Sequence, residues 1–232
     1  MIMENKRNYQ KEMENVIKDL NGEKKTLLLH SCCAPCSSYC LETLTPYFDV
    51  TVFYFNPNIN ESEEYNLRKS EQKRFIDEVY GNKVKFSEGR YRAAEFFDMA
   101  KGLEKAPEGG ERCYKCYEMR LNETAKTAKE GNYDYFCSTL SISPYKNTEW
   151  LNEIGKRLAD KYGVGFLPND FKKNEGYKRS IELSKQNNLY RQNYCGCIYS
   201  KYASLNELIE QEEKEKAEKE KAEKEKIKEE AK

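Results

Sequence analysis

A short apolar run at residues 26–29 leads directly into a cysteine-rich segment, and this junction constrains the fold more than any other part of the chain. The segment reads Leu27-Leu28-Leu29-His30-Ser31-Cys32-Cys33-Ala34-Pro35-Cys36-Ser37-Ser38-Tyr39-Cys40. The apolar run is typical of a buried strand, and the residues after it suit a helix. In open α/β sheets, ligands bind at the carboxyl ends of strands, where a phosphate-binding protein would carry glycines. Thiols at this turn instead predict soft-metal binding or thiol chemistry.

Strand-like and helix-like segments alternate along the rest of the chain. Runs of β-branched and aromatic residues predict further strands at 49–55, 83–87, 133–140 and 165–168. Charged segments with apolar residues at helical spacing predict helices at 62–80, 92–103, 147–162 and 174–188. The stretch at 109–121 begins flexible and is expected to become helical through about residue 129. This alternation favours an α/β fold with a parallel, doubly wound sheet flanked by helices.

Two segments of different character flank this α/β region. Residues 1–23 predict a polar N-terminal helix that stops at Asn21-Gly22. Residues 206–232 form a Lys/Glu-rich tail, and from residue 210 onward Ile227 is its one large apolar side chain. Such a tail cannot dock through an apolar face, so it is expected to be a solvated helix or disordered. The α/β domain is therefore expected over residues 24–205.

The number of cysteines and the balance of charged residues limit the classes of protein to which the chain can belong. Nine cysteines occur, residues 1–20 are charged and amphipathic, and no run approaches the roughly 18 apolar residues of a membrane span. These features predict a cytoplasmic protein whose cysteines bind metal or do redox work rather than form structural disulfides. Basic and acidic residues balance at 40 each, so global charge argues neither for nor against a nucleic-acid partner.

Two cysteine pairs have spacings that suit metal ligation. Cys113-Tyr114-Lys115-Cys116 can aim two thiolates at one metal from a single helical turn. Two other interpretations of this motif are a structural zinc site and a thioredoxin-like redox pair. The redox pair normally follows the first strand of its fold, and this motif lies too late in the chain for that. Adjacent Cys32 and Cys33 cannot both reach one atom from an extended segment. In a tight turn, the two thiolates could ligate two adjacent metals or two irons of one cluster.

A third pair, Cys195-Gly196-Cys197, can either ligate metal or close a small strained disulfide of the labile, catalytic kind. The three pairs lie far apart in the sequence, unlike the nearby knuckles of a zinc finger. They would have to converge at one crevice, as active-site residues of α/β folds do. Sulfur ligands without a second histidine favour an iron–sulfur cluster over catalytic zinc.

The remaining cysteines and the single histidine have simpler interpretations. Cys36 could return to the site through one helical turn after Cys32, so it stays open between ligand and structural thiol. Cys40 and Cys137 are interpreted as buried structural thiols. His30 is interpreted as a packed or supporting side chain rather than a proton donor.

Taken together, these motifs resemble the epoxyqueuosine reductase QueH family, over roughly residues 25–200. The matching stretches are His30-Ser31-Cys32-Cys33-Ala34-Pro35-Cys36, Phe55-Asn56-Pro57-Asn58, Cys113-Tyr114-Lys115-Cys116-Tyr117-Glu118-Met119-Arg120, Thr139-Leu140-Ser141-Ile142-Ser143-Pro144 and Tyr190-Arg191-Gln192-Asn193-Tyr194-Cys195-Gly196-Cys197. The resemblance implies a Rossmann-like fold of the adenine-nucleotide α-hydrolase type, with cysteines in place of the phosphate loop.

The same resemblance implies the last step of queuosine synthesis. In that step the epoxide oxygen of epoxyqueuosine at the wobble position of tRNA is removed, with electrons from an external donor. A [4Fe–4S] cluster is implied, and its ligands carried over from the family are Cys32, Cys33, Cys113 and Cys116. Cys195 and Cys197 would then be the redox-active pair, able to form a disulfide bond.

A second allocation of the cysteines stays open. It gives Cys33, Cys113, Cys116 and Cys197 to the cluster, and Cys32, Cys36 and Cys195 to an additional adjacent iron. Some members of the family carry aspartate where this chain has Cys36, and either side chain can ligate iron.

For the tRNA partner, residues 168–192 hold six basic and three acidic residues interleaved with tyrosines. This composition is typical of phosphate contact and base stacking. The basic residues of the segment are Lys172, Lys173, Lys178, Arg179, Lys185 and Arg191. Arg112, Arg120 and Lys146 are further, weaker candidates.

Two functions of other classes compete with the reductase. An ATP-dependent tRNA-thiolation enzyme on the same fold would need a Gly-rich loop after the first strand, and residues 31–38 contain no glycine. A zinc-stabilised tRNA-binding module would carry out no catalysis. Anaerobic purification distinguishes the two, because a brown protein that contains iron and sulfide would exclude the zinc module.

Overall fold

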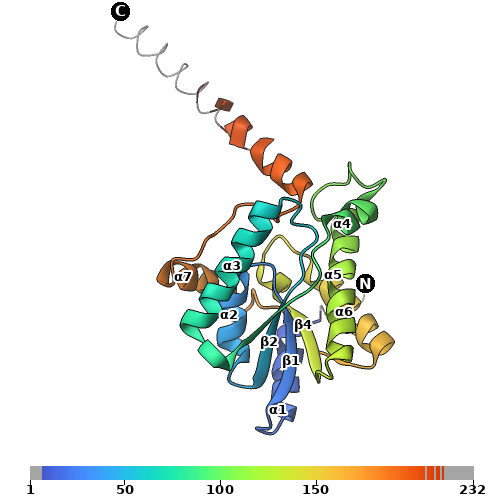
Figure 1. Ribbon diagram of the computed structural model, residues 1–232, viewed down its shortest axis with the longest axis vertical. Helices are drawn as coiled ribbons and strands as arrows, with labels where there is room; N and C mark the ends of the chain where they lie inside the picture. The colour runs from blue at the N-terminus through green and yellow to red at the C-terminus, as the bar shows by residue number, and fades with distance from the viewer. Residues whose placement is uncertain (1–6, 207, 212, 215, 217–232) are drawn as a thin grey trace, which may run out of the picture. The chain divides into compact units, whose positions relative to one another are not determined.

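The computed structural model describes residues 7–206, 208–211, 213–214 and 216, and its elements follow the predicted α/β alternation (Figure 1). The strands are β1 Lys25–His30, β2 Phe48–Tyr54, β3 Lys85–Glu88, β4 Tyr135–Ser138 and β5 Gly165–Phe166. The α-helices are α1 Tyr9–Asp19, α2 Ala34–Leu44, α3 Ser62–Val79, α4 Ala93–Ala100, α5 Glu111–Glu130, α6 Thr148–Tyr162 and α7 Gly176–Gln186, and the short 3₁₀ helices are η1 Gly81–Lys83 and η2 Thr139–Ile142. The chain divides into two compact units, residues 1–191, which contain all these elements, and residues 192–232.

The five strands form one sheet in the order β3-β2-β1-β4-β5, and each neighbouring pair is parallel. The chain builds outward from β1 to β2 and β3, and then returns to add β4 and β5 on the other side. The strand order therefore reverses between β1 and β4, and ligands bind at such reversals in open α/β sheets. The predicted parallel α/β sheet is confirmed, with the cysteine segment at its switch point.

Helices cover both faces of the sheet (Figure 1). Alternate residues of β1 point to opposite faces. Leu27 and Leu29 belong to a buried cluster shared with α2 and α3. Leu28 belongs to a second buried cluster shared with α5 and α6. A strand buried on both faces reads as a continuous apolar run, which explains the sequence at 27–29.

A close approach between α6 and β5 makes Gly155 a test of this packing. A Cβ atom at Gly155 would lie 2.2 Å from Cε2 of Phe166. We expect Gly155→Ala to lower the free energy of unfolding by about 1–3 kcal/mol, despite the better helix propensity of alanine. Urea unfolding measures this loss, and adding Phe166→Leu should recover part of it because the smaller side chain relieves the clash. An unchanged stability of the single variant would contradict the packing.

The ends of the chain are described only in part. The N-terminal helix expected over residues 1–23 is α1, and Asn21 and Gly22 after it have positive φ. Residues 198–206 are helical, as are the described residues from 208 to 216, whereas most of the predicted Lys/Glu tail lies outside the described residues. Within the part of the chain that the structure describes, every helix is too short or too polar to span a membrane.

Candidate metal centre

The cysteine turn, residues 31–37, joins β1 to α2 at the carboxyl edge of the sheet. Cys33 has an extended backbone at the helix N-cap, and Ser37 N–H donates to its carbonyl oxygen at 3.1 Å. Pro35 lies in the first helical turn, where its fixed φ favours the helix and its missing N–H costs nothing. The chain therefore enters α2 abruptly and holds its thiols at the helix N-terminus.

Three thiols of this turn lie together. The sulfur atoms of Cys32, Cys33 and Cys36 are all within 4.8 Å of one another, and those of Cys32 and Cys33 are 3.7 Å apart. Hydrogen bonding to the neighbouring thiols, followed by burial, raises the pKa of Cys36. Hydrogen bonding to Cys33 likewise raises the pKa of Cys32. Crowded buried thiols of this kind fit a thiophilic metal, which would replace their protons and draw them together.

The cysteine turn is clamped by polar contacts from β2 and α3. Ser31 N–H donates to Phe53 O at 2.9 Å, and Asn56 Nδ2 donates to Ser31 O at 2.8 Å. The hydroxyl groups of Ser31 and Ser37 contact Oε1 of the buried Gln72, at 2.8 and 3.0 Å. One side chain of α3 thus holds both ends of the turn, which fixes where the thiols point.

His30 is a buried support for this turn. Its Nδ1 lies 2.9 Å from Ser138 Oγ, and its Nε2 lies 3.1 Å from Phe55 O and 3.3 Å from Arg120 Nε. Burial, reinforced by the positive charge of Arg120, lowers the pKa of His30 to about 3. The imidazole is therefore neutral and joins β1 to both neighbouring strands, in agreement with the packed interpretation.

Two buried arginines supply positive charge near the thiols. Arg120, on α5, donates from Nη2 to Asn56 Oδ1 at 2.7 Å and favours the thiolate of Cys32. Arg68, on α3, pairs with Glu64 at 2.6 Å. Burial acts to lower the pKa of Arg68, but the charges of Cys33 and Glu64 raise it. Sequence reasoning did not identify Arg68, although an arginine aligned with the apolar face of α3 was a possible signal.

Cys113 and Cys116 lie in the first turns of α5, which begins at Glu111. Because α5 packs on β1 and β4 and runs against them, its N-terminus lies at the same sheet edge as the cysteine turn. Cys113 packs against the apolar cluster that contains Cys32 and Cys33, and Gly109 N–H donates to its sulfur at 3.3 Å. Among the described residues, the group of sulfurs within 4.8 Å of one another contains neither Cys113 nor Cys116.

The other cysteines are placed as follows. Cys40 and Cys137 are fully buried in the cluster on the α2 face of the sheet, and burial raises the pKa of each thiol. Cys195 and Cys197 lie in the second unit, where Cys195 N–H donates to Ser200 Oγ at 3.0 Å and Ser200 N–H donates to Cys197 Sγ at 3.4 Å. Gly196 lies between them with φ 113°.

The structure removes the three weaker tRNA candidates from the surface. Arg120 is fully buried, and Arg112 is 4% exposed, with Nη1 within 2.9 Å of the carbonyl oxygens of Leu103, Glu104 and Ala106. The side chain of Lys146 is 8% exposed and pairs with Glu108. The burial of Arg112 and Arg120 argues against phosphate contact by these two, because sequence alone does not distinguish a solvated cation from one that holds backbone carbonyls or a buried network. Phosphate contact by Lys146 stays a prediction.

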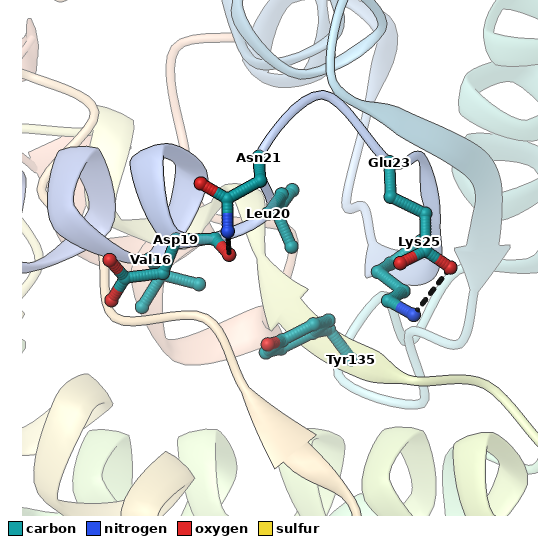
Figure 2. Close-up of a pocket in the computed structure, with 7 residues that line it drawn as sticks. All are labelled: Val16, Asp19, Leu20, Asn21, Glu23, Lys25 and Tyr135. Carbon is teal, nitrogen blue, oxygen red and sulfur yellow. Dashed lines mark hydrogen bonds and ion pairs between the residues drawn. The ribbon is translucent and has the colours of Figure 1, made fainter.

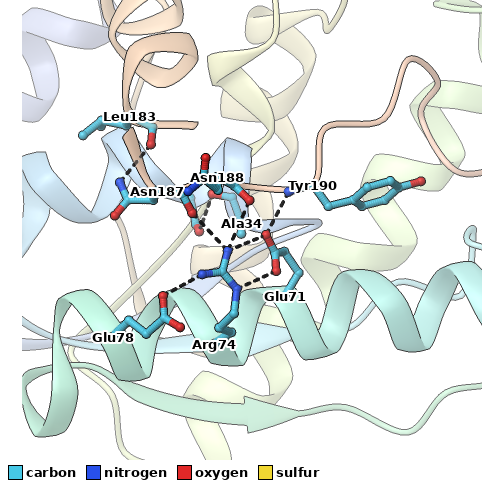
Figure 3. A network of polar contacts seen from close by, with 9 residues as sticks. Ala34, Glu71, Arg74, Glu78, Leu183, Asn187, Asn188 and Tyr190 are labelled. Atoms are coloured by element: carbon cyan, nitrogen blue, oxygen red, sulfur yellow. Dashed lines mark hydrogen bonds and ion pairs between the residues drawn. The ribbon is translucent and has the colours of Figure 1, made fainter. Parts of the chain in front are cut away.

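In the basic segment, half of the cations are paired with carboxylates. Among the described residues, the pairs are Lys172 with Asp170, Lys178 with Glu175, and Arg179 with Glu42 and Glu182. Figure 3 shows how the end of this segment is attached to α3. Arg74 Nη2 donates to Glu71 and to Asn187 O at 3.1 Å, and Glu71 accepts from Tyr190 N–H at 2.8 Å.

The hollow shown in Figure 2 lies at the opposite, amino edge of the sheet. It is lined by Val16, Asp19, Leu20, Asn21, Glu23, Lys25 and Tyr135. Lys25 and Tyr135 begin their strands, so this hollow is separated from the thiols by the length of the sheet. The Lys25–Glu23 ion pair at this hollow is accessible to solvent, and it is not an arrangement of catalytic groups.

Comparison with known proteins agrees with this geometry. Residues 27–203 match the family model "Epoxyqueuosine reductase QueH". The chain is 46% identical over 200 residues to "Epoxyqueuosine reductase QueH" of Staphylococcus epidermidis, covering 83% of this chain and 84% of the relative. The protein of the same name from Streptococcus pyogenes serotype M1 is 43% identical over 198 residues, covering 83% and 78%.

A more distant relative shows the same pattern. "Epoxyqueuosine reductase QueH" of Thermotoga maritima is 35% identical over 196 residues, covering 82% of this chain and 93% of the relative. The match of the family model spans the whole sheet, the cysteine turn and the beginning of the second unit. The chain therefore belongs to the epoxyqueuosine reductase QueH family.

Proposed function

We propose that the protein reduces epoxyqueuosine to queuosine at the wobble position of tRNA. Membership of a reductase family makes it an oxidoreductase. The observation that carries the proposal is the convergence of Cys32, Cys33 and Cys36 at the switch point of the sheet. Neither the thiolation enzyme nor the zinc module is favoured by the family or by this arrangement.

The overall reaction is a two-electron deoxygenation. The epoxide loses its oxygen as water, two electrons and two protons are consumed, and the two ring carbons are left as an alkene. An external reductant of low potential supplies the electrons. In this proposal, Cys195 and Cys197 are a redox pair that passes on two electrons when the dithiol becomes a disulfide.

We propose a [4Fe–4S] cluster on Cys32, Cys33, Cys113 and Cys116, with an additional adjacent iron as the alternative allocation that uses Cys36. An iron–sulfur centre supplies electron transfer, and an iron with an open position supplies Lewis acidity toward an epoxide oxygen. The chain contributes two helix N-termini, those of α2 and α5, which favour negative charge. Arg68 and Arg120 add positive charge beside the thiolates.

The domain assignment in this proposal is a catalytic domain over 24–205, preceded by the N-terminal helix and followed by the Lys/Glu tail. Basic residues of the 168–192 segment contact tRNA phosphates. Lys173 and Lys185 lie beside the paired cations of that segment and are the first to test, because no ion pair with a carboxylate is found for either among the described residues.

The test is anaerobic purification followed by a defined tRNA assay. We expect a brown protein that contains iron and acid-labile sulfide and that converts epoxyqueuosine in tRNA to queuosine, detected as a nucleoside lighter by one oxygen atom. A colourless zinc protein without turnover would establish the binding module instead. A coloured protein that inserts sulfur into tRNA would establish the thiolation enzyme.

A further inference from the structure

Two buried polar side chains near the cysteine turn have no hydrogen-bond partner among the described residues. Asn58 is 1% exposed, and neither its Oδ1 nor its Nδ2 is paired. Thr139 is fully buried, and its hydroxyl is also unpaired. Buried side-chain polar groups are normally satisfied, so unsatisfied groups indicate an unmet binding partner or a functional role.

Asn58 lies in the loop that leaves β2. Ile59 N–H donates to Asn56 O at 3.0 Å, which makes residues 56–59 a tight turn with Asn58 at its third position. The Asn56 side chain in the same turn donates to Ser31 O at 2.8 Å. A turn asparagine normally faces water, whereas Asn58 is buried beside the loop that holds the cysteine turn.

Thr139 occupies the corresponding position after β4. It begins η2 and directly follows Ser138, whose hydroxyl lies 2.9 Å from His30 Nδ1. β2 and β4 are the two neighbours of β1 in the sheet. The unpaired groups therefore flank the carboxyl end of β1 on both sides, and each lies within two residues of a side-chain contact to His30 or to Ser31 directly after it.

The chemistry of Asn58 restricts what can pair with it. Its amide offers a donor and an acceptor, so the partner must accept at one atom and donate at another. Thiolate or sulfide would satisfy only the N–H₂ group, and a metal ion only the oxygen. A group that carries hydroxyls satisfies both, and an epoxide oxygen beside them accepts one further hydrogen bond.

We infer that Asn58 and Thr139 form the polar wall of the substrate subsite and bind the oxygen-bearing five-membered ring of epoxyqueuosine. This inference rests on the proposed function. The Asn58 side chain makes hydrogen bonds to ring oxygens through both Oδ1 and Nδ2. The Thr139 hydroxyl donates or accepts a hydrogen bond from the opposite side of the ring. Because both side chains are buried, entry of the ring requires the loops after β2 and β4 to move apart.

The test uses Asn58→Leu and Thr139→Val, which keep the size of each side chain and remove its polar groups. Each variant is expected to keep the thermal midpoint of the wild type within about 1 °C, or to raise it, because no internal hydrogen bond is lost. Iron content and the visible spectrum should be unchanged. For tRNA that carries epoxyqueuosine, kcat/KM should fall about tenfold or more, because a site built for hydrogen bonds is left without them.

Matched controls are buried residues of the same types whose polar atoms are paired. Asn152 is 1% exposed; its Nδ2 donates to Asn169 O at 2.9 Å and its Oδ1 accepts from Asn169 N–H at 3.0 Å. Thr124 is fully buried and donates to Arg120 O at 2.8 Å. Asn152→Leu and Thr124→Val should each lower the thermal midpoint by about 2–4 °C or more.

A binding measurement separates ring recognition from general tRNA affinity. The wild type should bind tRNA with epoxyqueuosine more tightly than the same tRNA with guanine at the wobble position. Asn58→Leu should abolish this preference and leave affinity for the guanine form unchanged. A midpoint that falls as in the controls, a loss of iron, or an unchanged kcat/KM and preference would each overturn the inference. Absence of turnover by the wild type would instead overturn the proposed function.

Discussion

Cys33→Ala is expected to yield a folded protein that lacks the proposed iron centre and whose turnover is lowered by more than about 100-fold. Cys33 is 1% exposed and belongs to the three-thiol group, so its removal takes a ligand from the most compact set of donors. Changes around a metal site commonly cost 10–100-fold, and loss of a ligand itself costs more. The helix should be spared, because the Cys33 side chain makes no capping hydrogen bond for α2. Iron and sulfide analysis, the visible spectrum and the tRNA assay measure the result.

Cys137→Ala is the matched control for this experiment. Cys137 is also a fully buried thiol, but it lies within β4 and belongs to the apolar cluster on the α2 face. Its truncation should cost about 1 kcal/mol of stability and leave iron content and turnover unchanged. If Cys33→Ala retained its colour and activity, or if both variants lost iron equally, the thiol group around Cys33 would not be the metal centre.

The order of strands and helices could be predicted from the sequence because each buried element carries a local signal. The run at 27–29 is apolar on every residue, and β1 is indeed covered on both faces. Periodicity also identified α5 and α6. What periodicity does not contain is strand order, because the reversal between β1 and β4 depends on which face each crossover helix covers.

The candidate site was predictable only in part. The types of residue at the strand ends identified the cysteine turn, and helical spacing allowed Cys36 to return to it, as the structure shows. Gln72 and Arg68 could not be assigned, because their contacts to the turn span about 40 residues and depend on how α3 lies over the sheet. Arg120 was named only as a weaker tRNA candidate, because a buried arginine on α5 has no local signature. The orphaned polar groups of Asn58 and Thr139 are likewise properties of packing alone.

Arg120→Met is expected to weaken iron binding about 10–100-fold and to lower the stability of the metal-free protein less than Arg112→Met does. Arg120 is fully buried and donates hydrogen bonds to His30 Nε2 at 3.3 Å and to Asn56 Oδ1 at 2.7 Å. Methionine cannot make these two hydrogen bonds, whereas replacing Arg112 frees three backbone carbonyls. Loss of the buried guanidinium charge also removes its desolvation cost, which offsets part of the loss of these hydrogen bonds.

In the metal-bound protein, the positive charge of Arg120 is favourable, because an iron site with several thiolates carries net negative charge and attracts the guanidinium. Competition with an iron chelator measures the loss of affinity, and thermal unfolding of the metal-free protein measures stability. Arg112→Met is the comparison, because Arg112 holds three backbone carbonyls and its removal should lower the metal-free thermal midpoint by several degrees. If Arg120→Met behaved like Arg112→Met, Arg120 would serve the scaffold rather than the charge of the metal centre. Retention of most iron affinity by Arg120→Lys would show that positive charge, more than the guanidinium geometry, is what the thiolates require.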